Sequence, residues 1–170
     1  MDKLEMLTEF NQEAVTTKRV LERVPADKLG WRPHERSMSL GQLALHVATI
    51  PGGIARITKT DAFDVSNNSF TPPTPKNMEE VHAALEQSVR GVEETFKETT
   101  AEAAQANWHL MVGDKELFSI PRVNAWRSLM LNHWYHHRGQ LAVYLRLLDV
   151  PVPSIYGPSA DENPFARKEG

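Results

Sequence analysis

The most informative part of this sequence is the stretch Leu131-Asn132-His133-Trp134-Tyr135-His136-His137-Arg138-Gly139-Gln140-Leu141. In a helix beginning near Arg122, steps of three or four residues define a buried stripe. His133 and His137 lie one turn apart within it, so both rings can direct a nitrogen at one point about 2.0–2.1 Å away, the length of a zinc–imidazole bond. The spacing therefore predicts two ligands of a metal site. The full stripe is Trp126, Met130, His133, His137, Leu141, Tyr144 and Leu148.

The histidine pair by itself is weak support for a metal site. Seven histidines in a chain of this length produce by chance about 0.25 pairs with a spacing of four, and about 0.1 with both members on a core stripe. The alternative is two ordinary core histidines whose ring nitrogens have hydrogen-bond partners. A third ligand from another helix would separate the two interpretations.

Length and composition predict one domain over residues 1–170 and limit its chemistry. The chain has no cysteine, which excludes a thiolate zinc site, a thiol nucleophile and a redox couple of its own. A net charge of −3 without a basic stripe argues against nucleic acid as a partner. No stretch reaches the roughly 18 apolar residues of a membrane span, and the first 24 residues are charged and amphipathic, unlike a signal peptide. We expect a soluble cytoplasmic protein with no membrane partner.

Hydrophobic periodicity predicts an all-α protein, specifically a four-helix bundle. The sequence Ser39-Leu40-Gly41-Gln42 is a capping box that opens the second helix, and Asn77 with Glu80 opens the third. A long crossover loop is expected over 61–75, and a possible short hairpin over 108–118 turns at Gly113-Asp114. The four helices are expected at about 2–24, 39–57, 77–99 and 121–148.

A third histidine falls on the inward face of the second predicted helix. His46 lies three residues after Leu43 and four before Ile50, both apolar. With His133 and His137 it would form a three-imidazole site that leaves coordination positions open, which is typical of catalytic metal centres. The donor set suits a divalent ion such as zinc, nickel, iron or copper. His82 and His109 are expected to be surface residues.

Several neighbouring residues have two interpretations each. His136, Arg138 and Gln140 either support the ligands or face solvent. Pro51 either shapes a pocket mouth or only bends the helix, and Trp31 is a core residue or a substrate wall. Gly139, unfavourable in mid-helix, predicts close packing by a neighbouring segment.

Longer motifs resemble those of the DinB-like family of small bacterial proteins. The most specific is the second-helix histidine followed by His133-Trp134-Tyr135-His136-His137-Arg138-Gly139-Gln140. The other elements are Trp31-Arg32-Pro33, Ser39-Leu40-Gly41-Gln42-Leu43-Ala44-Leu45-His46, Val152-Pro153 and Tyr156-Gly157-Pro158-Ser159.

The resemblance implies a homodimeric four-helix bundle of the DinB/YfiT type with a divalent metal on His46, His133 and His137. Characterised relatives include metal-dependent thiol S-transferases and isomerases that use bacillithiol, mycothiol or similar thiols. The implied partner is therefore a small-molecule substrate, with a low-molecular-weight thiol as cosubstrate. Many members have no known activity, so the resemblance constrains fold and site better than reaction.

Three functions follow, and whether the protein is an enzyme stays open at this point. The first is a metal-dependent thiol S-transferase in which Arg138 or Tyr156 positions the substrate. The second is a metal-dependent hydrolase, which would need a carboxylate base; Asp161 or Glu162 would reach the centre only if the tail folds back. The third is a non-enzymatic metal-binding or stress-response bundle.

Overall fold

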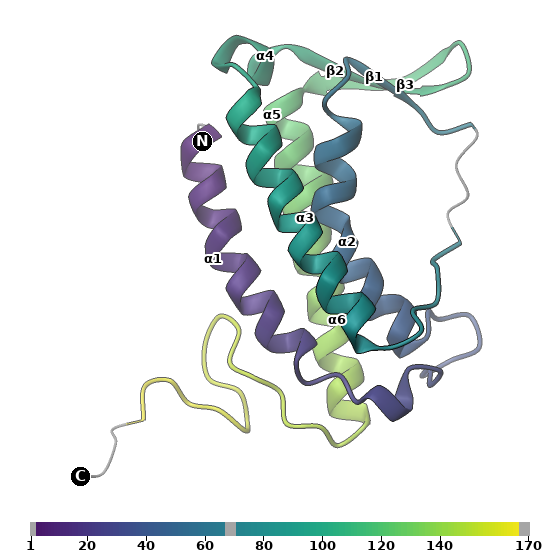
Figure 1. The fold of residues 1–170 in the computed structure, drawn as a ribbon, viewed down its shortest axis with the longest axis vertical. Coiled ribbons are helices and arrows are strands. Elements are labelled where there is room, and N and C mark those ends of the chain that lie inside the picture. The colour runs from purple at the N-terminus through teal and green to yellow at the C-terminus, as the bar shows by residue number, and fades with distance from the viewer. Residues whose placement is uncertain (1–2, 67–70, 167–170) are drawn as a thin grey trace.

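The computed structural model describes residues 3–66 and 71–166, and most of them belong to four long helical stretches that lie side by side (Figure 1). All four lie where hydrophobic periodicity predicted them. The fourth consists of three consecutive segments, α5, η2 and α6. The long elements are α1 (Lys3–Leu21), α2 (Leu40–Ile57), α3 (Met78–Glu98), α5 (Arg122–Ala125), η2 (Trp126–Asn132) and α6 (His133–Leu147), and the short ones are η1 (Ala26–Lys28) and α4 (Ala101–Gln105).

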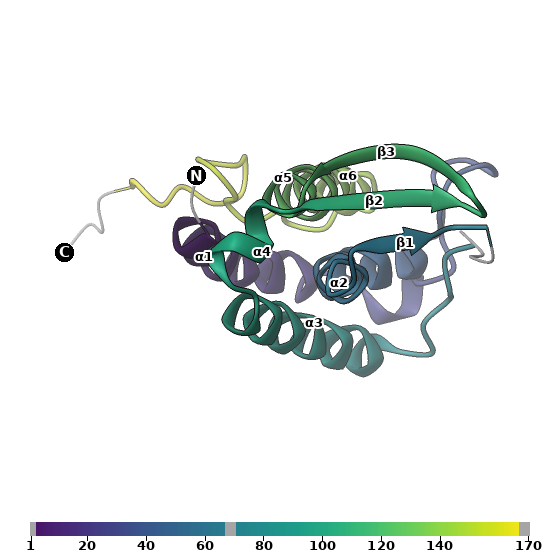
Figure 2. The same ribbon diagram turned by 90° about the horizontal axis from the view of Figure 1, so that it is seen from above.

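The fold is mostly helical, as expected, but a three-stranded sheet covers one end of the helices (Figures 1 and 2), so it is not purely all-α. Strands β2 (Asn107–Val112) and β3 (Lys115–Pro121) form the predicted antiparallel hairpin. Its turn contains Gly113 at φ +56°, a backbone conformation that glycine adopts without steric cost.

The third strand, β1 (Ala62–Asp64), pairs in parallel with β2 and lies in the segment predicted as crossover loop. A strand of three residues leaves no periodic signal, and it forms because the free edge of β2 offers unpaired backbone groups. The rest of the connection is irregular where it is described. The Asn67-Asn68-Ser69 part of the predicted loop lies outside the described residues.

Side-chain caps define where α2 and α3 begin. The Ser39 hydroxyl accepts a hydrogen bond from the Gln42 amide at 3.2 Å, and the Ser39 amide donates to the Gln42 side chain at 2.9 Å, completing the predicted capping box. The Asn77 side chain accepts from the Glu80 amide at 3.0 Å. Both caps satisfy amides that a helix start leaves without partners.

In the second half of the fourth helix, the buried face is shifted by one position from the predicted stripe. Trp134 and Arg138 are buried, whereas His133 and His137 are only half-buried. The cause is η2, a π-helical segment in which hydrogen bonds span five residues, so the side chains that follow it are turned relative to an uninterrupted α-helix. From η2 to the end of α6, the fully buried residues are Trp126, Met130, Leu131, Trp134, Arg138, Leu141 and Leu145.

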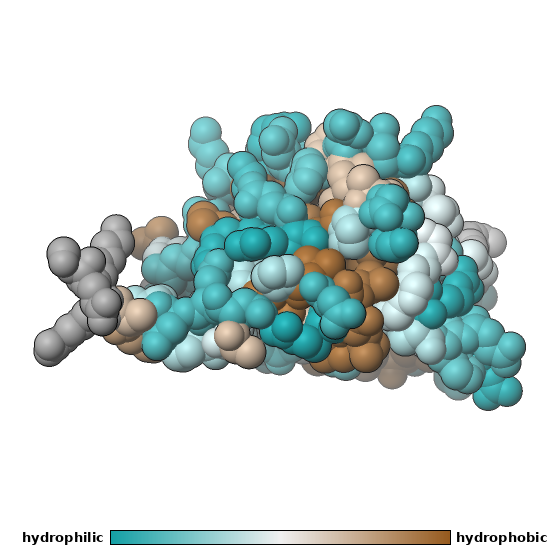
Figure 3. Space-filling view, turned by 90° about the horizontal axis from the view of Figure 1, so that it is seen from below, coloured by the Kyte–Doolittle hydropathy of each residue, from teal (hydrophilic) through white to brown (hydrophobic). Residues whose placement is uncertain are grey.

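The two ends of the helical body have different surfaces. The sheet closes one end, where the buried Arg122 guanidinium donates to the Thr58 carbonyl at 2.7 Å and pairs with Asp61 at 2.8 Å. Figure 3 shows the opposite end, where hydrophilic side chains surround a smaller hydrophobic area. Among the helices of the described residues, none is long and apolar enough to cross a membrane.

Helices α2 and α3 approach each other closely at Gly52. A β-carbon added there would lie 2.8 Å from the Ser88 α-carbon, whereas one added at the neighbouring Gly53 would meet nothing within 4 Å. The Gly52 amide also donates to the Ser88 hydroxyl at 2.6 Å. Close packing, predicted for Gly139, therefore occurs at Gly52 instead; Gly139 is exposed and a side chain there would have open space.

We expect Gly52→Ala to lower the free energy of unfolding by about 1–3 kcal/mol, because the added methyl group forces α2 away from α3. Gly53→Ala is the matched control; it should raise stability by about 0.5–1 kcal/mol through better helix propensity. Urea unfolding followed by circular dichroism measures both. Equal effects of the two substitutions would contradict the close approach.

Candidate metal centre

The structure brings His46 of α2 together with His133 and His137 of α6. Ring centroids lie 5.3 Å apart for His46 and His133 and 4.6 Å apart for each of the other two pairs. One ligand atom from each ring lies within 4.8 Å of the other two, and Nε2 of His133 lies 2.9 Å from Nε2 of His137. Two nitrogens bound to one tetrahedral zinc would be about 3.3 Å apart. The arrangement is therefore close to that of a metal site.

The surroundings of the His46 ring favour a neutral imidazole. The ring is half-buried, and among the described residues none forms a hydrogen bond with it. Burial, followed by the proximity of His137 and His133, lowers its pKa from 6.5 to about 4. A neutral imidazole with an available lone pair is the form that coordinates a metal.

His133 and His137 have lowered pKa values as well, in both cases chiefly because of burial. A hydrogen bond to the Leu129 backbone partly offsets the shift at His133, and one to Gln140 does so at His137. Leu129 belongs to η2, so the π-helical segment supplies the group that orients His133. Such segments are frequent at functional sites, but the sequence contains no signal that predicted this one.

Gln140 and His136 form a chain of hydrogen bonds behind His137. The Gln140 side-chain oxygen lies 2.8 Å from His137 Nδ1, and its amide nitrogen lies 3.1 Å from His136 Nε2. If His137 Nδ1 donates to Gln140, its Nε2 carries no hydrogen and faces the centre of the cluster. Gln140 thus orients a candidate ligand, and the exposed His136 holds Gln140 in place.

Arg138 has a structural role, which corrects the expectation that it orients ligands, faces solvent or positions substrate. Its guanidinium is 1% exposed and pairs with Glu13 of α1 at 2.5 Å. It also donates to Thr17 at 3.1 Å and to the Tyr156 hydroxyl at 2.5 Å. Arg138 and Tyr156 therefore join α6 to α1 and to the C-terminal tail.

The tail does fold back, but its carboxylates form ion pairs with arginines. Glu162 pairs with Arg19 at 2.5 Å and with Arg23 at 3.2 Å. Asp161 pairs with Arg146 and accepts a hydrogen bond from the Val152 amide at 2.8 Å. Neither belongs to the histidine cluster. Neither Asp161 nor Glu162 therefore supplies the carboxylate base that a hydrolase would need.

The remaining aromatic and histidine positions lie outside the cluster. Trp31 is half-buried and packs edge-to-face on Tyr144 with ring centroids 5.5 Å apart, which agrees with a core role. His109 lies in the hairpin with Nδ1 2.5 Å from a Glu116 carboxylate oxygen. His82 is half-buried on α3, and like His109 it belongs to no potential metal-binding group of the described residues.

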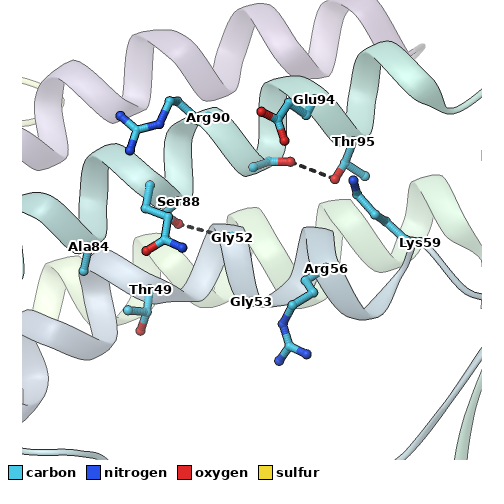
Figure 4. Close-up of a pocket in the computed structure, with 12 residues that line it drawn as sticks. Thr49, Gly52, Gly53, Arg56, Lys59, Ala84, Ser88, Arg90, Glu94 and Thr95 are labelled. Carbon is cyan, nitrogen blue, oxygen red and sulfur yellow. Dashed lines mark hydrogen bonds between the residues drawn. The ribbon is translucent and has the colours of Figure 1, made fainter.

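A groove of about 680 Å³ lies between α2 and α3 (Figure 4), and none of the three histidines of the cluster lines it. Thr49, one turn after His46, lines it together with Gly52 and Gly53, immediately after Pro51. The helix continues past Pro51 to Ile57, so Pro51 does not end it. The cations Arg56 and Arg90 in Figure 4 point away from each other and do not converge on a common point.

These observations define a predominantly helical protein with a small sheet and a candidate three-histidine metal centre between two helices. A model of the DinB family matches residues 1–168. The chain belongs to the DinB family, as the sequence motifs predicted.

Relatives with solved structures support the fold. A DinB-like protein from Bacillus cereus ATCC 10987 has a TM-score of 0.69 at 21% identity and covers 89% of this chain and 95% of its own. The DinB-like protein YjoA from Bacillus subtilis has a TM-score of 0.67 at 20% identity and covers 89% of this chain and 96% of its own.

The sequence is also similar to that of a further protein. The uncharacterized protein YrdA from Bacillus subtilis (strain 168) is 24% identical over 158 residues, which are 92% of this chain and 89% of that protein.

The lowered histidine pKa values predict that the metal-free protein loses stability as the pH falls. Folding keeps the His46 pKa near 4, against 6.5 ordinarily, so below about pH 6.5 the unfolded chain binds a proton that the folded state excludes. The stabilisation is complete at pH 7 and declines towards pH 4. Urea unfolding across this range measures it, and His46→Gln should flatten the dependence. An unchanged slope in that variant would contradict the assignment.

Gln140→Ala should weaken metal binding by about 10- to 100-fold, because His137 loses the acceptor that fixes its ring. Chelator competition measures the affinity. His82→Ala is the control, a half-buried histidine outside the cluster, and should leave the affinity unchanged. Wild-type affinity in the Gln140 variant would show that Gln140 does not orient a ligand.

Proposed function

We propose that His46, His133 and His137 bind a divalent metal ion and form the functional centre of a metal-dependent enzyme. The observation that carries this proposal is the convergence of three neutral imidazoles from two helices, with the His46 ring lacking any hydrogen bond to the described residues. Three protein ligands leave at least one coordination position for another molecule, as in catalytic sites. Three imidazoles accept zinc, nickel or iron.

The best candidate reaction is transfer of a low-molecular-weight thiol to an electrophilic small molecule. A divalent ion at this position would supply Lewis acidity that favours the thiolate form of the cosubstrate. The chain contains no cysteine, so the sulfur nucleophile must come from that cosubstrate. The groove beginning at Thr49, one helical turn from His46, is our candidate for the electrophile site.

Hydrolysis is the less favoured enzymatic alternative. It benefits from a carboxylate base next to the metal, and the tail carboxylates Asp161 and Glu162 are paired with arginines. A non-enzymatic metal-binding or stress-response role is the third candidate, because fold and ligands do not guarantee turnover.

We also propose that the protein is a cytoplasmic homodimer whose helical body is a four-helix bundle of the DinB/YfiT type. The four long helical stretches support the bundle assignment. Val143 and Leu147 on α6 are 58% and 57% exposed and offer apolar surface for a second copy of the chain.

Protein purified without a histidine tag should retain about one divalent ion per chain, because three imidazoles from a preformed site bind tightly. Mass spectrometry of the native protein measures the metal content. His137→Ala should lose most of it, while His82→Ala should keep it. Full metal content in the His137 variant would remove the proposed centre.

The same preparations separate the candidate activities. A thiol transferase should consume thiol and electrophile at a rate that chelator abolishes and added metal restores, and the His137 variant should be inactive. Chelator-sensitive ester or amide hydrolysis without any thiol would favour the hydrolase. Metal retention with neither activity would favour the non-enzymatic role.

A further inference from the structure

Pro51 leaves a backbone acceptor without its helical partner in the middle of α2. Proline has no amide hydrogen, so the Val47 carbonyl, four residues earlier, receives no hydrogen bond from position 51. Val47 is fully buried, so water does not replace the missing donor. An unpaired carbonyl in such a place is unfavourable.

Trp134 of α6 supplies the missing hydrogen bond. Its indole nitrogen donates to the Val47 carbonyl at 2.8 Å, and both residues are 0% exposed. The indole ring is held by stacking on Phe10 of α1, with centroids 5.3 Å apart and an interplanar angle of 28°. Contact with α1 therefore fixes the orientation of the Trp134 indole, whose N–H group donates to α2.

The two residues joined by this hydrogen bond are the immediate neighbours of candidate metal ligands. Val47 follows His46, and Trp134 follows His133. The bond thus fixes the position of α2 against α6 at the level where ligands from both helices must meet. Five residues further along α2, the Gly52 amide donates to the Ser88 hydroxyl at 2.6 Å and fixes the other side of the helix to α3.

We propose that Pro51 and Trp134 are positioning residues of the three-histidine centre: Pro51 frees the Val47 carbonyl, and the Trp134 indole uses it to set His46 opposite His133 and His137. This inference rests on the proposed metal-binding function. Metal–nitrogen distances are constrained to within about 0.2 Å. A small shift of α6 along α2 therefore weakens binding although the three ligands are all still present.

Trp126 provides a matched control on the same helical stretch. It too is 0% exposed, its indole donates at 2.8 Å to the Thr58 hydroxyl just beyond α2, and its ring stacks on Phe96 at 4.3 Å and 29°. It lies two turns before His133. Trp126→Phe therefore removes a comparable hydrogen bond between the fourth helix and the end of α2, but at a position away from the candidate ligands.

The test measures cobalt(II) affinity by visible absorption and zinc affinity by chelator competition, alongside urea unfolding of the metal-free proteins. Trp134→Phe should weaken both affinities by about tenfold and change the shape of the cobalt spectrum. Trp126→Phe should lower metal-free stability similarly but leave affinity and spectrum unchanged. If Trp134→Phe does not fold, benzothienylalanine at position 134 keeps the two-ring shape without the N–H group and should give the same loss.

The outcomes separate this inference from the proposed function. Wild-type protein that binds neither ion would overturn both. Wild-type binding with unchanged affinity and spectrum in the Trp134 variants would overturn only the positioning role. Equal weakening in the Trp126 and Trp134 variants would also overturn it, because general loosening of the helices would then explain the loss.

Discussion

The packing of α2 against α6 is the constraint on which the histidine centre depends. His46 comes from one helix and His133 and His137 from the other, so their convergence requires a fixed separation and register of the two helices. The buried hydrogen bond from the Trp134 indole to the Val47 carbonyl sets both. It exists because a proline four residues later leaves that carbonyl free. An unfavourable helix residue is thus compensated by a tertiary contact next to the site.

The motif from His133 to Gln140 divides into three structural roles according to helical position. His133 and His137 face the centre, and His136 and Gln140 lie outside it and orient His137. Trp134 and Arg138 point into the core, where Arg138 pairs with Glu13 and holds α1. Burial of a charged guanidinium is acceptable here because carboxylate, hydroxyl and carbonyl partners surround it. Only part of the motif can therefore take a direct role in chemistry.

Membership of the DinB family fixes the fold more firmly than the reaction. The solved relatives are about one-fifth identical to this chain and share its architecture, whereas activity depends on the residues around the site. Here those residues are three neutral imidazoles, no cysteine and two tail carboxylates held by arginines. This combination is the basis of our proposal that the nucleophile arrives with a cosubstrate.

The sequence alone determined the four long helical stretches, the hairpin and the placement of three histidines on facing helices. These features depend on local patterns, namely the caps at Ser39 and Asn77, the turn residues of the hairpin and the helical spacing of apolar residues. Only the tertiary structure decided β1, η2 and the core positions of Trp134 and Arg138. A short strand and a π-helical turn are stabilised by neighbours distant in sequence, so they leave no periodic signal. For the same reason the partner of the Val47 carbonyl, 87 residues away, could be identified only in the folded chain.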